Sequence, residues 1–316
     1  MPEITVQGQV VQFQDSVKAS RRGIVFLHGA GGSHHTFRDQ WAGLRGAVRM
    51  VIPDLPGHGR SGGPPLESVD ACVAWVVDFV KEIGLDRFIL AGHSMGGAIA
   101  LQAALGGLKG LEALVLLGTG ARLRISPVIF DGIGERFREF APELVGWMTS
   151  AASSDLLRED ITNDVLSTRP ATFLADFHAC NGFDVMNRLD AIRVPTLVVN
   201  GDDDRLTPLK YGEYLATNIP GAVLKIIHGA GHLAMLEKPT EVNAVITSFV
   251  HSLMAPRTDK VDYWKNSNQR QRWVATALLD IEPGLRRIRG YRHLPALRHA
   301  LQVELNLISN YEEKLA

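Results

Sequence analysis

Six short segments of the chain are apolar at almost every position. Their length and continuous apolar character are typical of strands buried on both faces of a sheet, as the strands of parallel sheets are. We therefore predict six buried strands in GIVFLH (23–28), RMVIPD (49–54), RFILAG (87–92), ALVLLG (113–118), TLVVNG (196–201) and VLKIIHG (223–229).

Other stretches show the periodicities of an exposed hairpin and of helices. Residues 3–13 alternate between apolar and polar around Gly8, which predicts two edge strands joined in a hairpin. Apolar residues recur at helical spacing over 66–84, 95–107 and 239–254. Because strands and helices alternate along the chain, we predict an α/β fold with a mostly parallel, doubly wound sheet.

Two regions depart from this alternation and define the predicted domain organisation. Residues 121–190 contain several short helical patterns and no strand-like run, so we interpret them as a helical insertion between two strands. Residues 255–316 follow the last predicted helix and form a C-terminal helical extension. The α/β core would then consist of residues 1–120 and 191–254.

Composition narrows the class of protein without identifying it. The chain has 316 residues, 46% hydrophobic and 21% charged, which suits a globular protein with a large core. Its net charge of −1 gives no general reason to expect nucleic-acid or membrane binding. No apolar run approaches the length of a membrane span, and the N-terminus does not resemble a signal peptide, so we expect a cytoplasmic protein. The two cysteines, Cys72 and Cys180, are expected to be buried thiols.

The segment ILAGHSMGGAIA (89–100) carries the first chemical signal. It contains Gly-x-Ser-x-Gly with Ser94 at its centre, directly after a predicted strand and directly before a predicted helix. A nucleophilic serine on a sharp strand-to-helix turn requires this setting. The alternative is an ordinary turn of small residues in which Ser94 caps a helix.

A serine hydroxyl needs a base and an orienting carboxylate to act as a nucleophile. The base candidate is His232, in a glycine-flanked loop after the last strand, with His228 as the near alternative. The preceding strand is followed by three consecutive acids, Asp202, Asp203 and Asp204, and three such residues can equally form a solvated turn. We expect Asp204 to be the partner of His232, which gives the order serine, acid, histidine along the chain.

The glycine-rich segment FLHGAGGSHH (26–35) follows the first buried strand and could bring backbone N–H groups close to a ligand. We expect the N–H groups of Ala30 and Met95 to stabilise an oxyanion. His28, His34 and His35 lack matching carboxylates or cysteines nearby, so no metal site is predicted. The segment also lacks the dinucleotide-binding spacing, so no cofactor is predicted.

Five segments of the chain together resemble the α/β-hydrolase superfamily. They are HGAGGS, PDLPGHGRS, GHSMGG, GDDDRLTP and GAGHLAMLEKP, and they occur in the family's order. The resemblance implies that the acid is Asp204, the last Asp of Gly-x-x-Asp, and that Ala30 follows the His-Gly pair as an oxyanion donor. It also implies that residues 121–190 form a cap over the active site. PDLPGHGRS is expected to be structural.

The resemblance leaves several chemistries open, because one fold supports many reactions. We expect a serine carboxylesterase acting on short- to medium-chain esters through an acyl-enzyme on Ser94, with a small-molecule ester as its partner. The alternatives are a carbon–carbon bond hydrolase or a perhydrolase with the same triad, or a non-catalytic ligand receptor. Eight large apolar residues of the insertion line the acyl pocket or form the cap's own core: Phe130, Phe137, Phe140, Trp147, Met148, Phe173, Phe177 and Phe183.

The C-terminal extension stands apart from these motifs. Residues 255–316 carry eleven Lys and Arg against seven Asp and Glu. Within them, 272–305 distantly resembles the C-terminal ends of insertion-element transposases, which carries no catalytic motif. We interpret the extension as an amphipathic appendage that packs on the body or on a partner subunit, so a homo-oligomer formed through it is an expectation. A basic nucleic-acid contact and a functionless remnant are the alternatives.

Overall fold

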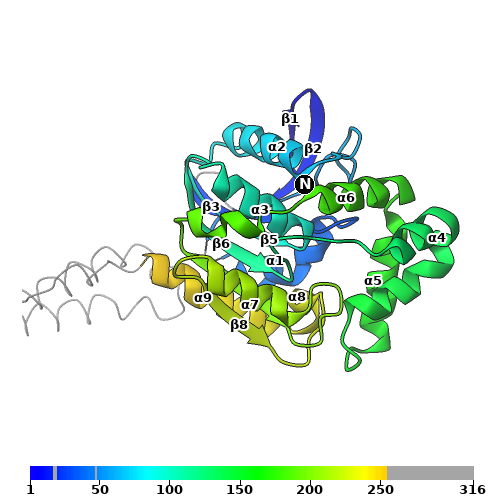
Figure 1. The fold of residues 1–316 in the computed structure, drawn as a ribbon. Helices are drawn as coiled ribbons and strands as arrows, with labels where there is room; N and C mark the ends of the chain where they lie inside the picture. The colour runs from blue at the N-terminus through cyan, green and yellow to red at the C-terminus, as the bar shows by residue number, and fades with distance from the viewer. Residues whose placement is uncertain (17–19, 47, 255–316) are drawn as a thin grey trace, which may run out of the picture. The chain divides into compact units, whose positions relative to one another are not determined.

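Eight strands form one sheet in the order β1-β2-β4-β3-β5-β6-β7-β8, in a computed structural model that describes residues 1–16, 20–46 and 48–254 (Figure 1). Strands β3 to β8 run parallel to one another, whereas β2 pairs antiparallel with both β1 and β4. The predicted mostly parallel α/β fold is confirmed. The strands are β1 (Glu3–Val6), β2 (Gln9–Asp15), β3 (Arg22–Leu27), β4 (Met50–Pro53), β5 (Arg87–His93), β6 (Leu111–Leu117), β7 (Thr196–Gly201) and β8 (Val223–Ile227).

The central strands are buried on both faces, which explains their continuous apolar sequences. In β3, Val25 and Leu27 join the core that includes helices α2 (Val69–Glu82) and α3 (Met95–Leu105). Phe26, between them in the chain, instead packs against Phe37, and the two ring centroids are 5.0 Å apart. Since successive side chains of a strand point to opposite faces, helices and short connecting segments must cover both sides of the sheet.

The predicted hairpin is present, but the prediction that both of its strands lie at an edge is wrong. Of the two hairpin strands, only β1 is an edge strand, because Phe13 of β2 lies opposite Pro53 of β4. Val11 and Phe13 are correspondingly buried. Alternation in one segment reports which side chains are buried, but not whether a distant strand supplies a second neighbour.

The structure also contains helices that the sequence pattern did not reveal. Helix α1 (Arg38–Leu44) has seven residues, and helix α7 (Leu209–Asn218) buries little beyond Leu215. Short helices with few buried positions give a weak periodic signal. The last helix of the described chain, α9 (Pro239–Met254), follows its predicted bounds.

Three helices lie between β6 and β7, and we call them the cap helices. They are α4 (Pro127–Met148), α5 (Asp155–Ser167) and α6 (Pro170–Gly182). Helix α4 is interrupted by a kink at Arg136, whose φ and ψ of −144° and 43° are not helical. Pro142 lies inside the same helix and cannot donate a backbone hydrogen bond. Figure 1 shows the three helices gathered on one side of the sheet.

Residues Met1–Phe249 form one compact unit, to which the sheet and the cap helices belong. The predicted extension, 255–316, lies outside the described residues. Cys72 and Cys180 are buried free thiols, as predicted, and burial raises the pKa of Cys72 to about 12. Within the described part of the chain, no helix is both long enough and apolar enough to span a bilayer.

The turn between β5 and α3 depends on two glycines. A Cβ on Gly92 would overlap the carbonyl of Gly96, and a Cβ on Gly96 would overlap the carbonyl of Leu27 in β3. In both cases the obstacle is backbone, which cannot rotate away as a side chain can. The strand, the turn and the helix therefore approach one another closely only because these two positions carry no side chain.

We expect Gly92→Ala to destabilise the protein, because the added methyl group would force β5 and α3 apart. The loss in the free energy of unfolding should be about 1–3 kcal/mol, as for overpacked cores, measured by urea denaturation. Gly146→Ala is the matched control, since open space surrounds Gly146 in α4 and alanine favours a helix. Equal stability of the two variants would contradict the close-approach argument.

Candidate active site

Ser94 lies at the tip of the turn between β5 and α3 in a strained backbone conformation. Its φ is 53° and its ψ is −114°, a combination that residues other than glycine rarely adopt. The carbonyl of Ser94 accepts hydrogen bonds from Gly97 N and, at 2.8 Å, from Thr119 Oγ1. These bonds hold the turn, and strain of this kind is typical of functional sites.

His232 and Asp204 come together at the ends of neighbouring strands. Asp204 follows β7, His232 follows β8, and His232 Nδ1 lies 2.9 Å from Asp204 Oδ2. Both residues are buried. Because the carboxylate accepts, the proton of His232 lies on Nδ1, and Nε2 remains available to accept a proton.

Thr207 contacts both Asp204 and His232, and no sequence pattern indicated this role. Its hydroxyl donates to Asp204 Oδ2 at 2.8 Å and lies 3.2 Å from His232 Nδ1. The N–H groups of Leu206 and Thr207 donate to the other oxygen, Asp204 Oδ1. Burial alone would raise the pKa of the Asp204 carboxyl, but His232 and the Thr207 hydrogen bonds outweigh it and lower that pKa. Asp204 therefore stays ionised.

The three consecutive acids have different partners. Asp202 accepts from His228 Nδ1 at 2.8 Å, and the His228 side chain is largely exposed whereas that of Asp202 is about one-third exposed. Asp203 accepts from Ser150 Oγ in the segment after α4. The alternative base, His228, thus pairs with Asp202 at the surface, away from Asp204.

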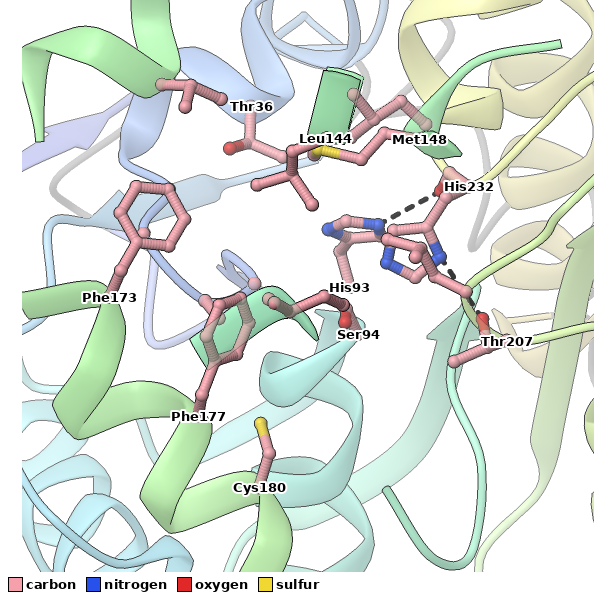
Figure 2. A pocket seen from close by; sticks show the side chains of 18 of the residues that line it. Thr36, His93, Ser94, Leu144, Met148, Phe173, Phe177, Cys180, Thr207 and His232 are labelled. Carbon is pink, nitrogen blue, oxygen red and sulfur yellow. Dashed lines mark hydrogen bonds between the residues drawn. The ribbon is translucent and has the colours of Figure 1, made fainter. Parts of the chain in front are cut away.

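His93, the residue before the serine, packs against His232. The two ring centroids are 4.6 Å apart, and His93 Nε2 donates to the carbonyl of His232 at 3.0 Å (Figure 2). Burial, followed by the charge of His232, lowers the pKa of His93 to about 3. His93 is therefore neutral and supports the His232 loop without titrating near neutral pH.

Ser94 and His232 line the same cavity, together with His93 and Thr207. Within the described chain, no hydrogen bond joins the Ser94 hydroxyl to His232. Hydrogen bonds between catalytic groups are often long before substrate binds. The structure thus brings the acid and the histidine into contact and places the serine on the same cavity wall.

The two predicted oxyanion donors flank Ser94. Ala30 lies in the cavity wall, and Met95 is the first residue of α3. Neither backbone N–H has a hydrogen-bond partner among the described residues, whereas the neighbouring Gly31 and Gly32 N–H groups are both bonded. Two unpaired N–H groups beside a serine are what a tetrahedral oxyanion requires.

The cavity has a volume of about 120 Å³ and is lined mainly by apolar side chains. Of the eight large apolar residues singled out in the insertion, Met148, Phe173 and Phe177 line it. Figure 2 shows Phe173 and Phe177 on one side of the cavity, across from His93 and His232. Phe140 and Phe183 are buried elsewhere in the protein.

The histidines of the glycine-rich segment bind separate partners. His28 Nδ1 donates to the carbonyl of Gly29, and its Nε2 accepts from Leu55 N. His34 donates to Asp54, and His35 lies 3.4 Å from Asp164. Within the described residues, no group of three or more His, Cys, Asp or Glu side chains is arranged to hold a metal ion.

The segment PDLPGHGRS connects the core to a cap helix, which the sequence analysis did not predict. Asp54 accepts from the N–H groups of His34 and Arg60, as expected of a structural turn. His58 donates from Nδ1 to the carbonyl of Pro56 and from Nε2 to Asp176 of α6 at 2.8 Å. Because the Pro56 carbonyl and the Asp176 carboxylate both accept hydrogen bonds, this arrangement favours the imidazolium form of His58.

The comparison with protein families agrees with this geometry. Residues 24–245 match the Alpha/beta hydrolase family. The chain belongs to this family. The match runs from within β3 to the first half of α9, and so includes the turn at Ser94, the acid after β7 and the histidine after β8.

The names of proteins similar to this α/β hydrolase describe several different activities. It is 27% identical over 248 residues to 2-hydroxy-6-oxo-6-phenylhexa-2,4-dienoate hydrolase of Burkholderia cepacia, covering 72% of this chain and 87% of the relative. It is 26% identical to 3-oxoadipate enol-lactonase 1 of Acinetobacter baylyi, covering 78% and 95%. Among solved structures, it superposes on a thermophilic esterase from Thermogutta terrifontis with a TM-score of 0.71 and 25% identity, covering 80% and 98%.

We expect the pair between His58 and Asp176 to make stability pH-dependent. Burial opposes the charge on His58, but the hydrogen bond and charge of Asp176 outweigh it and raise the pKa of His58, with the Pro56 carbonyl and the charge of Asp54 adding to the rise. A raised pKa stabilises the fold fully below the unfolded value of about 6.5, and the contribution is lost as pH rises through the folded value.

The measurement is the free energy of unfolding in urea at several pH values from about 6 to 9. The advantage of the wild type over His58→Gln should be largest at the lowest pH and shrink as pH rises. His178→Gln removes an exposed histidine of α6, the helix that carries Asp176, and serves as the control. A difference between wild type and His58→Gln that grows with pH would contradict the assignment.

Proposed function

We propose that this α/β hydrolase is a serine carboxylesterase that cleaves short- to medium-chain esters. The observation that carries the proposal is the buried hydrogen bond between His232 Nδ1 and Asp204 Oδ2, beside a cavity that Ser94 also lines. A carboxylate in this position fixes the tautomer of the imidazole and stabilises its cation. The name of the thermophilic esterase relative supports the same substrate class.

The proposed reaction begins with Ser94. His232 Nε2 removes the hydroxyl proton, and Ser94 Oγ attacks the ester carbonyl carbon. The negative oxygen of the tetrahedral intermediate accepts hydrogen bonds from the N–H groups of Ala30 and Met95. His232 then gives the proton to the departing alcohol, and a water molecule repeats the attack on the acyl-enzyme.

The surroundings of the site favour these steps. The apolar walls of the cavity strengthen the hydrogen bonds to the oxyanion, because they exclude water from its neighbourhood. The positive end of α3 also lies at Ser94 and favours negative charge there. The apolar side chains of Met148, Phe173 and Phe177 in the cavity wall support an apolar acyl group.

We expect the wild type to hydrolyse a series of p-nitrophenyl esters from acetate to decanoate, with the highest kcat/KM at short to medium chain length. Ser94→Ala should lower kcat by at least about 10⁴-fold, since the nucleophile is lost. Ser126→Ala removes an exposed hydroxyl at the start of α4 and is the matched control.

Three results would contradict the proposal. Ser94→Ala could retain the wild-type rate. A fluorophosphonate could label Ser94 without any ester turnover, as expected of a ligand receptor. The protein could instead cleave a carbon–carbon bond in a 2-hydroxy-6-oxo-dienoate, the substrate named for the Burkholderia cepacia relative, while leaving simple esters intact.

The three consecutive acids permit a matched test of the proposed role of Asp204. Asp204→Asn should lower kcat by about 10⁴-fold, because the amide would favour the wrong tautomer of His232. Asp202→Asn changes an exposed carboxylate that pairs with His228, so its kcat should stay close to that of the wild type. Circular dichroism checks that both variants fold, and similar losses in both would refute the assignment.

A further inference from the structure

The cap helices hold the backbone next to the proposed oxyanion donor from two sides. Gly31 N donates to Asp176 Oδ2 of α6 at 2.7 Å. Thr168 Oγ1, between α5 and α6, donates to the carbonyl of Gly31 at 2.8 Å. Both polar backbone groups of the residue that follows Ala30 are therefore bonded to the cap.

Apolar packing holds the same residue. Gly31 has a φ of 64°, and a Cβ there would overlap the ring of Phe173 in α6. The ring thus lies against the bare Cα of Gly31 and leaves it no room to move towards the cap. Asp176 is itself fixed, since it is buried and also accepts from His58 Nε2.

The core fixes the preceding peptide unit, whose N–H belongs to Ala30. The carbonyl of that unit, Gly29 O, accepts from Gly32 N at 3.0 Å and from His28 Nδ1 at 2.9 Å. Because a peptide unit is planar and trans, fixing its carbonyl fixes the opposite direction of its N–H. Gly32 N belongs to the same peptide unit as the Gly31 carbonyl. Its bond to Gly29 O therefore persists only while Gly31 keeps its conformation.

We propose that Thr168 and Asp176 are positioning residues that aim the N–H of Ala30 at the oxyanion, so the cap helps to complete the oxyanion hole. This inference rests on the proposed function. Glycine-rich backbone is otherwise free to adopt many conformations, and a donor is useful in the transition state only if it is already oriented. The cap is thereby part of the catalytic apparatus as well as a wall of the cavity.

The test compares two threonine-to-valine substitutions in the cap. Thr168→Val removes the hydroxyl that bonds to Gly31, and Thr162→Val removes a hydroxyl that bonds within α5 to the carbonyl of Arg158. Both replace a partly buried threonine and remove one hydrogen bond to a carbonyl. Thr168→Ser, which keeps the hydroxyl, is the rescue variant.

We expect Thr168→Val to lower kcat on the best p-nitrophenyl ester by about 10-fold, with KM within about twofold of the wild type. This loss is smaller than the 10²- to 10³-fold effect of deleting a donor outright, because the N–H remains but is less well aimed. Affinity for a boronic acid, which forms a tetrahedral adduct with serine, should fall in parallel. Thr162→Val and Thr168→Ser should match the wild type in all three measurements.

A second measurement does not depend on catalysis. Hydrogen exchange at the Gly31 amide, followed by NMR, should be slow in the wild type and at least about 10-fold faster in Thr168→Val than in Thr162→Val. Unchanged exchange, or equal kcat and boronic-acid affinity in the two valine variants, would overturn the inference. If the wild type hydrolyses no ester, the proposed function fails, and the exchange measurement still decides whether the cap holds this loop.

Discussion

The strained turn at Ser94 is the constraint on which the candidate site depends. A serine with a positive φ can stand there only because the chain on either side passes unusually close to other backbone, at Gly92 and Gly96. The energy needed to hold this conformation comes from the buried parallel strands and from α3, which anchor both ends of the turn. The serine is thereby lifted to the edge of the sheet where the loops after β3, β7 and β8 also meet.

Hydrogen bonds between the core and the cap connect these loops. The loop after β3 is bonded through Gly31 to Thr168 and Asp176, and His232 N donates to the carbonyl of Met148 at the end of α4. Glu237 adds a further connection, because it accepts from Gly231 N and from Ser150 N in the segment after α4. The cap helices are therefore joined to the site through backbone groups on two sides, in addition to the apolar contacts that line the cavity.

Much of the fold could be predicted from the chain because its signals are local. The six apolar runs identify strands buried on both faces, and glycines around a serine identify a tight turn. Where the sequence-based prediction failed, the cause was also physical. The second strand of the hairpin gains a neighbour, β4, that is distant in sequence. Helix α7 buries too few residues to give a periodic pattern. In the site, Thr207 carries no distinctive signal until the structure shows it touching both Asp204 and His232.

The sequence by itself determined the order and type of the main elements and proposed a serine, an acid and a histidine in that order along the chain. It also favoured Asp204 among three adjacent acids, but only the tertiary structure shows that this carboxylate bonds to His232 and that His228 pairs with Asp202. The tertiary structure also decided that His58 and Asp176, over a hundred residues apart, form a buried pair between core and cap. The reason is that propensity and periodicity act over a few neighbouring residues, whereas a hydrogen bond between distant side chains depends on how the whole chain is packed.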